Sequence, residues 1–339
     1  MLTPNQPAES RTNRIVIGSI ITLMLLLGIA LGVVMQHQPG TRPAWRVAIT
    51  NWPGFDPLYI AGQKGFLKEQ GLDIELVPVN SLSDIRKAFE RGTVDGYTGA
   101  IMEAVESVQD SNTPHRIVLV TDYSKGADQL LADPSITTLD DLRGKRLSLE
   151  ITSPIARYML ARALAGSSVT QADMDLRPYN QSILIDQTLR GNLDAVITYE
   201  PYTTAIQAKR PMHVLFSSAD IPEEVLDAIM VSPAMLASDP GLSRKLQAAW
   251  QAALDYIATH PEETTTLLAQ RYGITGPEYQ SMLTGVHIFN RTEIQRLASL
   301  HGVQQTLWRM SQVLNPAQPL TREQIAAMVQ IWYQREAAR

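Results

Sequence analysis

The sequence contains no cysteine among its 339 residues. Disulfide bonds, thiolate catalysis, cysteine-containing zinc sites and lipid attachment through an N-terminal cysteine are therefore excluded. Six histidines are scattered along the chain without HxH or HxxxH spacing. The sequence thus predicts no metal site and no cofactor.

Runs of lysine and arginine are also missing, and the formal net charge is −5. A chain of this kind offers no concentration of positive charge to bind nucleic acid, so we expect no nucleic-acid partner. The catalytic and nucleotide-binding patterns GxSxG, HExxH, GxGxxG and GxxxxGK[ST] do not occur. We therefore predict no catalytic residue, and an enzyme is the least supported of the alternatives below.

Charge is absent from one long stretch near the N-terminus, Ile15 to Met35, which is 21 residues long. About 20 apolar residues suffice for a helix to cross the hydrocarbon core of a bilayer. Arg11 and Arg14 stand just before this run and favour a cytoplasmic N-terminus. The sequence thus predicts a cytoplasmic tail at 1–14 and a transmembrane anchor at 15–35.

A cleaved signal peptide is the competing interpretation of the same run. Its apolar region usually spans about 7–15 residues, and Ala30-Leu31-Gly32 is a small-x-small cleavage pattern. Both interpretations send the remaining chain across the membrane. We expect a protein of the bacterial inner membrane with a periplasmic body, joined to the anchor by a Pro/Gly linker at 36–44.

The body alternates strand and helix patterns in two similar series. The first series has strands near 45–50, 72–79, 94–97 and 116–121, with helices at 58–70 and 84–91 between the first three; the second has strands near 146–150, 174–179 and 194–199 with helices at 154–164 and 183–190. This order predicts parallel strands joined by crossover helices. We expect two α/β lobes, the first formed by 45–125 and 232–339 and the second by 126–231.

The two series also share a local motif, because Arg91-Gly92-Thr93-Val94-Asp95 resembles Arg190-Gly191-Asn192-Leu193-Asp194. Asp95 and Asp194 follow a glycine turn, so we interpret them as structural. Beyond Ser238 the sequence predicts helices near 239–260, 262–272, 292–313 and 321–336, packed back on the first lobe.

Polar and aromatic residues gather at the predicted carboxyl ends of strands, where parallel α/β sheets bind ligands beside helix N-termini. The candidate ligand-binding residues are Asn51, Trp52, Phe55, Thr98, Gly99, Asp122, Ser124, Asp128, Thr152, Ser153, Tyr158, Tyr199 and Glu200. Trp52 either stacks on a ligand or packs in the core. Tyr158 either reaches the cleft or packs in the core.

Ser153-Pro154 begins a helix, with serine as N-cap and proline at the first helical position. The free N–H groups of that turn are suited to an acidic group of a ligand. Asp122, Asp128 and Glu200 either meet a ligand amine or satisfy turns, and Glu200 is the strongest candidate. Because burying an anion beside unpaired carboxylates is costly, this set favours an amine-bearing, zwitterionic or heterocyclic ligand.

At these residues the sequence resembles a family of ABC-transporter binding proteins, which handles nitrate, taurine and other sulfonates, and thiamine-precursor pyrimidines (NMT1/THI5-like). The resemblance rests on Asn51–Ala61, Lys64-Gly65-Phe66, Asp122–Asp128, Asp141–Arg146 and Tyr199-Glu200-Pro201, in order. It implies the type-II periplasmic binding fold, with two chain crossings as a hinge, which we expect near 122–130 and 228–233.

The resemblance implies capture of a small-molecule ligand for an ABC permease and its ATPase. The alternative in another class is a membrane-anchored sensor that signals to a partner protein. Two departures from the family pattern stand out. The lipoprotein cysteine is missing, and Arg157 occupies the position where the family's Gly-Ser-x-x-His-Tyr pattern has histidine. The resemblance therefore does not identify the ligand.

Overall fold

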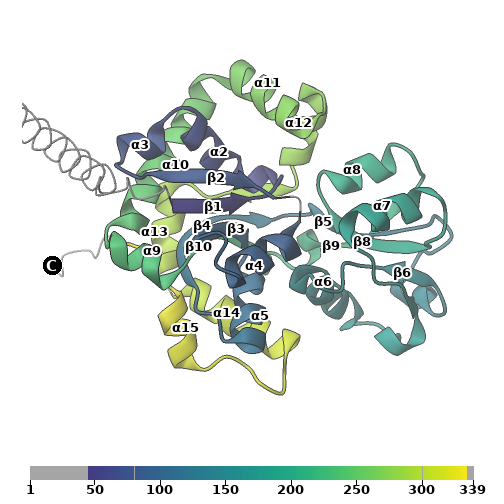
Figure 1. Ribbon diagram of the computed structural model, residues 1–339. Helices are drawn as coiled ribbons and strands as arrows, with labels where there is room; N and C mark the ends of the chain where they lie inside the picture. The colour runs from purple at the N-terminus through teal and green to yellow at the C-terminus, as the bar shows by residue number, and fades with distance from the viewer. Residues whose placement is uncertain (1–44, 80, 300, 334–339) are drawn as a thin grey trace, which may run out of the picture. The chain divides into compact units, whose positions relative to one another are not determined.

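The computed structural model describes residues 45–79, 81–299 and 301–333, which are organised around two mixed β-sheets (Figure 1). The first sheet has the strand order β11-β4-β10-β3-β1-β2 and the second the order β7-β6-β8-β5-β9. We call each sheet with the helices that follow its strands a lobe. The expected span 15–35 lies outside the described residues. Within them, no helix has the length and apolar character needed to cross a bilayer.

The first lobe begins with the strand–helix alternation that the sequence predicts. Its strands are β1 (Trp45–Ile49), β2 (Ile74–Pro78), β3 (Gly96–Ala100), β4 (Arg116–Ser124), β10 (Leu226–Val231) and β11 (Val286–Ile288), and its early helices are η1 (Pro53–Phe55), α2 (Asp56–Gln63), α3 (Phe66–Glu69), α4 (Leu82–Glu90) and α5 (Ile101–Ser111). β1 pairs in parallel with β2 and β3, whereas β10 runs antiparallel between β3 and β4. The carboxyl ends of β1 and β3 therefore meet at one edge, where a ligand site is expected.

The second lobe repeats this plan on a smaller scale. Its strands are β5 (Asp128–Ala132), β6 (Arg146–Ser148), β7 (Asp175–Leu176), β8 (Ala195–Tyr199) and β9 (His213–Ser217), and its helices are η2 (Leu139–Leu142), α6 (Pro154–Leu164), η3 (Gln171–Asp173), α7 (Gln181–Leu189) and α8 (Tyr202–Gln207). β6 pairs in parallel with β7 and β8, and β5 runs antiparallel to both β8 and β9.

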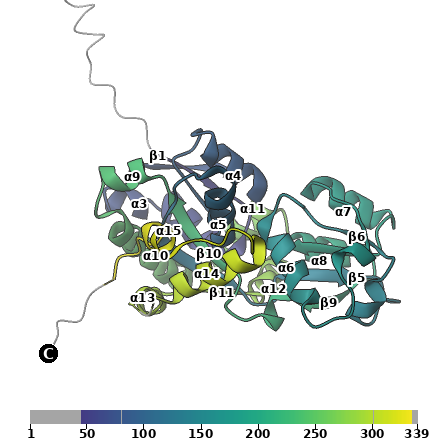
Figure 2. The ribbon, with the colours of Figure 1, turned by 90° about the horizontal axis from the view of Figure 1, so that it is seen from below.

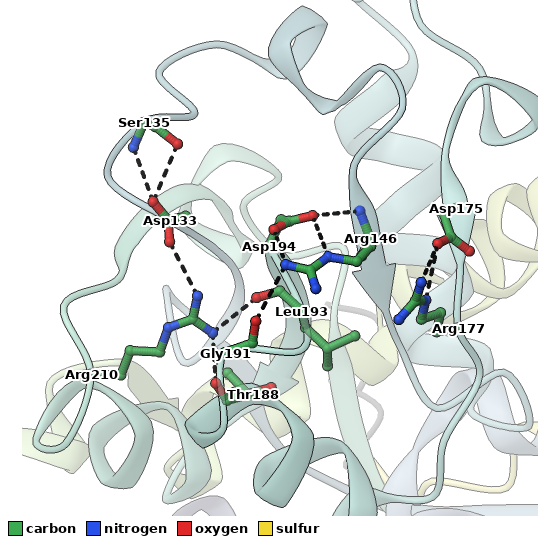
Figure 3. A network of polar contacts seen from close by, with 10 residues as sticks. All are labelled: Asp133, Ser135, Arg146, Asp175, Arg177, Thr188, Gly191, Leu193, Asp194 and Arg210. Carbon is green, nitrogen blue, oxygen red and sulfur yellow. Dashed lines mark hydrogen bonds and ion pairs between the residues drawn. The ribbon is translucent and has the colours of Figure 1, made fainter.

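Asp95 and Asp194 have matching roles in the two lobes. The carboxylate of Asp95 accepts the backbone N–H of Arg46 at 2.9 Å, and that of Asp194 accepts the backbone N–H of Arg146 at 2.8 Å. The Arg146 guanidinium also pairs with Asp194 (Figure 3), which holds the pKa of Asp194 at about 2. Each aspartate thus fixes the edge of the first parallel strand of its lobe, so the structural interpretation of both is correct.

The chain crosses between the lobes twice, between β4 and β5 and between β9 and β10. At the crossings, the Ser124 and Ser218 hydroxyls lie 2.7 Å apart, and Ser218 Oγ accepts the Gly126 N–H at 2.7 Å. The second crossing runs through η4 (Ser218–Asp220) and precedes the expected position at 228–233. The second lobe expected from the sequence includes 226–231, but this segment is β10 of the first sheet, so that boundary is wrong.

The C-terminal helices surround the first sheet, some packed against β4 and others against neighbouring helices (Figures 1 and 2). They are α9 (Pro233–Ser238), α10 (Leu242–Thr259), α11 (Pro261–Tyr272), α12 (Gly276–Leu283), α13 (Arg291–Ser299), α14 (Gly302–Leu314) and α15 (Arg322–Met328). Two side chains of α10 hold it to the first lobe: Ser243 Oγ donates to the Val118 carbonyl in β4, and Trp250 Nε1 donates to the Phe289 carbonyl just after β11. Instead of one helix at 292–313 the chain forms two, with His301 left-handed at φ 55°.

Candidate functional site

A small cavity lies between the two lobes. It is lined from the first lobe by Thr50, Trp52, Phe55, Leu82 and Asp227, and from the second lobe by Asp128, Ile155 and Tyr199. Its free volume is about 10 Å³, the space of roughly one water molecule. The lobes are therefore in contact around this cavity and must separate there to admit any larger molecule.

Trp52 connects the two lobes at this cavity. It lies in the turn between β1 and η1, just before η1, and its side chain is buried. Its indole N–H donates to Asp122 Oδ1 at 2.9 Å. Its ring meets that of Tyr199 from the second lobe edge-on, with centroids 6.3 Å apart. The indole is thus held in a fixed orientation, with aromatic surface at the cavity.

Asp122 and Asp227 form a buried pair of carboxyl groups. They lie opposite each other in the antiparallel register of β4 and β10. Thr121 Oγ1 also donates to Asp122, at 2.8 Å. Burial raises the pKa of both groups, and the nearby carboxylates Asp122 and Asp128 raise the pKa of Asp227 further. Both groups are therefore harder to ionise than an exposed carboxyl group.

Asp128 begins β5 and presents a third carboxyl group to the cavity. Burial raises its pKa to about 7, against a hydrogen bond from Ser124 that lowers it. The negative charges of Asp122 and Glu200 also raise it. No lysine or arginine is among the cavity-lining residues of the described structure. The cavity therefore combines aromatic surface with acidic groups that have no cationic partner at its wall, an arrangement suited to a cation or a hydrogen-bond donor.

A larger groove of about 680 Å³ lies between α4 of the first lobe and α7 of the second. It is lined by Ser81, Asp84, Lys87, Glu150, Ile151, Thr152, Pro178, Tyr179, Asn180, Gln181, Ser182, Ile185 and Tyr202. Tyr202 contacts the cavity residue Tyr199 at 5.4 Å between ring centroids. The groove is polar, with a single lysine among several donors and acceptors.

The structure brings part of the predicted site together. Trp52, Phe55, Asp128 and Tyr199 line the cavity, Asp122 bonds to Trp52 behind it, and Thr152 lines the groove. Thr98 and Gly99 are buried within β3, and Asn51 is exposed and lines neither space. Ser124 is used at the crossing, where its hydroxyl accepts the Asp128 N–H.

Three other predicted residues are hydrogen-bonded to protein groups and do not line the cavity. Ser153 caps α6 by accepting the Ala156 N–H. Tyr158 donates to Glu224 at 2.7 Å, away from the cavity. Glu200 is not at the cavity wall, because its carboxylate accepts the Thr204 N–H and hydroxyl and so caps the first turn of α8. The pattern Tyr199-Glu200-Pro201 does not distinguish such a cap from a ligand contact.

Four cavity residues were not predicted, namely Thr50, Leu82, Ile155 and Asp227. Asp227 had a signal in the sequence, since it is the one charged residue in the apolar run from Val225 to Val231. Charged groups rarely occupy such a strand interior without a specific role. The missing step was the strand itself, because β10 was not predicted and its pairing with β4 could not be foreseen.

Comparison with known proteins identifies the family of the chain. The sequence profile described as NMT1/THI5 like matches residues 52–264, more than half of the chain. The chain belongs to this family. The family resemblance predicted from the sequence is thereby confirmed. A search of curated protein sequences found no match.

Solved structures share the fold. The alkanesulfonate-binding protein SsuA from Xanthomonas axonopodis pv. citri, bound to MOPS, superposes with a TM-score of 0.67 at 14% identity, covering 86% of this chain and 99% of that one. The periplasmic nitrate-binding protein NrtA from Synechocystis PCC 6803 gives 0.63 at 13%, covering 85% and 86%. The desulfurization enzyme DSZB gives 0.55 at 19%, covering 84% and 96%. The type-II periplasmic binding fold is therefore confirmed for the described residues, and this fold also carries an enzyme.

Proposed function

We propose that this protein captures a small organic solute that carries a protonated amine, or a ring with hydrogen-bond donors, and delivers it to an ABC importer. Membership of the NMT1/THI5-like family supports a solute-binding role. The similar sulfonate-binding and nitrate-binding proteins support the same role on the same fold. Capture takes place outside the cytoplasmic membrane, a location supported by the periplasmic nitrate-binding protein of the same fold.

The single observation that carries the ligand class is the meeting of Asp128 and Asp227 with Trp52 and Tyr199 at one cavity. A cation there gains from the carboxylates and from the aromatic faces. An inorganic anion there would be buried beside acidic groups, with no lysine or arginine at the wall to offset the cost. The carboxylates therefore favour an amine over nitrate or an amine-free sulfonate.

Binding of such a cation is linked to the ionisation of Asp128. A positive charge beside the carboxyl favours its ionised form. Where Asp128 is neutral, binding therefore releases its proton, so affinity increases as pH rises through about 7. An anionic ligand has the opposite dependence, because it prefers the neutral carboxyl.

The ligand is identified by native mass spectrometry of the full chain, purified without denaturation and released into the gas phase from detergent. We expect a copurified small molecule with an amine or a donor-bearing ring. Asp128→Asn should then weaken its binding about tenfold or more in calorimetry, since a hydrogen bond to a charged group contributes roughly 1.5–3 kcal/mol. Glu200→Gln is the matched carboxylate variant and should bind normally, because Glu200 caps α8. Equal affinity of Asp128→Asn and parent would contradict the proposal.

A membrane-anchored sensor is the second candidate, and the uncharged run Ile15–Met35 favours it. A permanent anchor suits a receptor that reports lobe closure to a partner. Intact-mass measurement of the membrane-extracted protein decides whether the run is retained, and a mature chain starting near 31–40 in the periplasmic fraction would exclude the anchor. A neighbouring permease and ATPase gene pair would support transport, and a lone signalling gene would support the sensor.

A further inference from the structure

A cluster of charged side chains joins the lobes away from the cavity. Arg157 on α6 of the second lobe forms an ion pair with Glu106 Oε1 on α5 of the first lobe. Arg86 on α4 lies 3.3 Å from the other oxygen of Glu106 and 3.3 Å from Glu103. Its guanidinium also approaches the Thr152 carbonyl of the second lobe at 3.5 Å. Glu106 thus sits between one arginine from each lobe.

The cluster is buried but incompletely hydrogen-bonded. Side-chain exposure is 9% for Glu106 and 11% for Arg86, against 34% for Arg157. Within the described structure, Arg86 Nε, Arg157 Nε, Glu106 Oε2 and both Glu103 oxygens are buried without a partner in hydrogen-bonding geometry. When buried charges are paired but incompletely hydrogen-bonded, their mutual attraction offsets little more than the free-energy cost of removing them from water. Such a contact stabilises the closed state only modestly, as a reversible contact must.

The packing of α6 explains why this pair couples to lobe closure. α6 belongs to the second lobe but packs against α5 and α14 of the first (Figure 2). Its first turn carries both Ile155, at the cavity wall, and Arg157. Movement of α6 away from α5 therefore removes Ile155 from the cavity and Arg157 from Glu106 together.

We propose that Glu106 is the shared acceptor of an interlobe latch, held by Arg157 from the second lobe and Arg86 from the first, which sets how often the empty cleft closes. The inference rests on the proposed solute-binding function, whose affinity it tunes from outside the cavity. An apparent dissociation constant equals the intrinsic one divided by the fraction of molecules in the competent state. Arg157 and Glu106 are positioning residues, since neither lines the cavity.

The absence of cysteine makes a direct test practical, because two introduced cysteines are the only sites that a spin label can modify. Arg91→Cys at the end of α4 and Ile183→Cys on α7 place labels on exposed positions of different lobes. The distance between the two spin labels is measured by double electron–electron resonance spectroscopy in the full chain, in detergent and without added solute. Arg157→Gln, Glu106→Gln and the double variant are compared with Arg177→Gln, whose ion pair with Asp175 lies within the second lobe.

We expect Arg157→Gln and Glu106→Gln each to raise the ratio of long to short label–label distances about tenfold. The double variant should show the same ratio as either single variant, because both substitutions remove the same contact. Arg157→Lys keeps the charge and should stay mostly closed, which separates loss of the latch from misfolding. Unchanged separations in Arg157→Gln, or an equal change in Arg177→Gln, would overturn the latch. The measurement uses no solute, so it is independent of the proposed ligand, whose failure would appear instead as absence of solute binding to the parent.

Discussion

Asp128 places an ionisable group where folding by itself favours a neutral one. It is 4% exposed, and its pKa rises to about 7 because of burial. Binding sites often retain such groups at the expense of stability. The same burial strengthens the attraction between this carboxylate and a cationic ligand, because water in the cavity does not screen the two charges from each other.

This account predicts that Asp128→Asn stabilises the empty protein at pH 8. The folded pKa of about 7 lies above the ordinary value of 3.8. The penalty for ionising Asp128 is therefore absent below pH 3.8 and complete above about 7. We expect a gain of about 1–3 kcal/mol in the free energy of unfolding at pH 8, most of which disappears at pH 4. Urea unfolding at both values measures it, and a loss of stability at pH 8 would refute the assignment.

At the scale of residues, the sequence predicted the cavity residues that lie at or after the end of a parallel strand. It did not predict those that the pairing of distant strands brings to the cavity. Trp52 follows β1 and Tyr199 ends β8, so the rule for strand ends was enough to select them. Asp227 reaches the cavity through the antiparallel pairing of β10 with β4, which no local pattern encodes. The aromatic neighbours of Glu200 favour a ligand contact, whereas its carboxylate is bonded to Thr204 in the next turn.

At the scale of elements, α11 and α12 are tied to the start of α2 through one buried carboxylate. Asp56 Oδ1 accepts from Arg271 at 2.5 Å and from Tyr272 at 2.9 Å, and Oδ2 accepts from Tyr279. Arg271 also donates to the Thr50 carbonyl at 2.8 Å. Because Thr50 lines the cavity, this tie positions the first-lobe wall as well as the helices.

Arg271→Met should therefore destabilise the protein strongly. It removes the cationic partner of Asp56, which is 1% exposed, and leaves a buried carboxyl with two phenols. Loss of one member of a buried ion pair costs about 3–5 kcal/mol. Arg190→Met is the matched control, since its ion pair with Asp186 is exposed and contributes little to stability. Similar midpoints for the two variants in thermal unfolding would count against a structural tie at Asp56.

Elements with strong periodicity were predicted, and elements that depend on distant partners were not. The strand–helix alternation of both lobes is present in the sequence because turns and caps delimit it, as Ser153-Pro154 does for α6. β5 lies outside the predicted strands, and β11 is a three-residue strand supported by β4. Such short segments gain their strand conformation from pairing rather than from local preference.

At the scale of the molecule, two lobes of one plan enclose a cavity too small for an organic ligand, so binding of a solute at this cavity requires opening at the two crossings. The order of elements and the family were predictable from the sequence, because the motifs recur at family spacing along residues 52–264. The contact between the lobes was not predictable from the sequence, because it depends on pairs of residues far apart in the chain, such as Trp52–Tyr199 and Arg157–Glu106.

The central claim is that this cavity selects positive charge, and thermal unfolding with charge-matched compounds at pH 8 tests it most directly. The panel contains primary amines, amino sulfonates, amine-free sulfonates of the same size, and nitrate, each with parent and Asp128→Asn. A ligand at about 100 times its dissociation constant stabilises the folded state by about 2.7 kcal/mol, which is readily measured. The account predicts stabilisation of the parent by amine-bearing compounds and a smaller effect on Asp128→Asn. Stabilisation by nitrate or by amine-free sulfonates, with no amine effective, would contradict it.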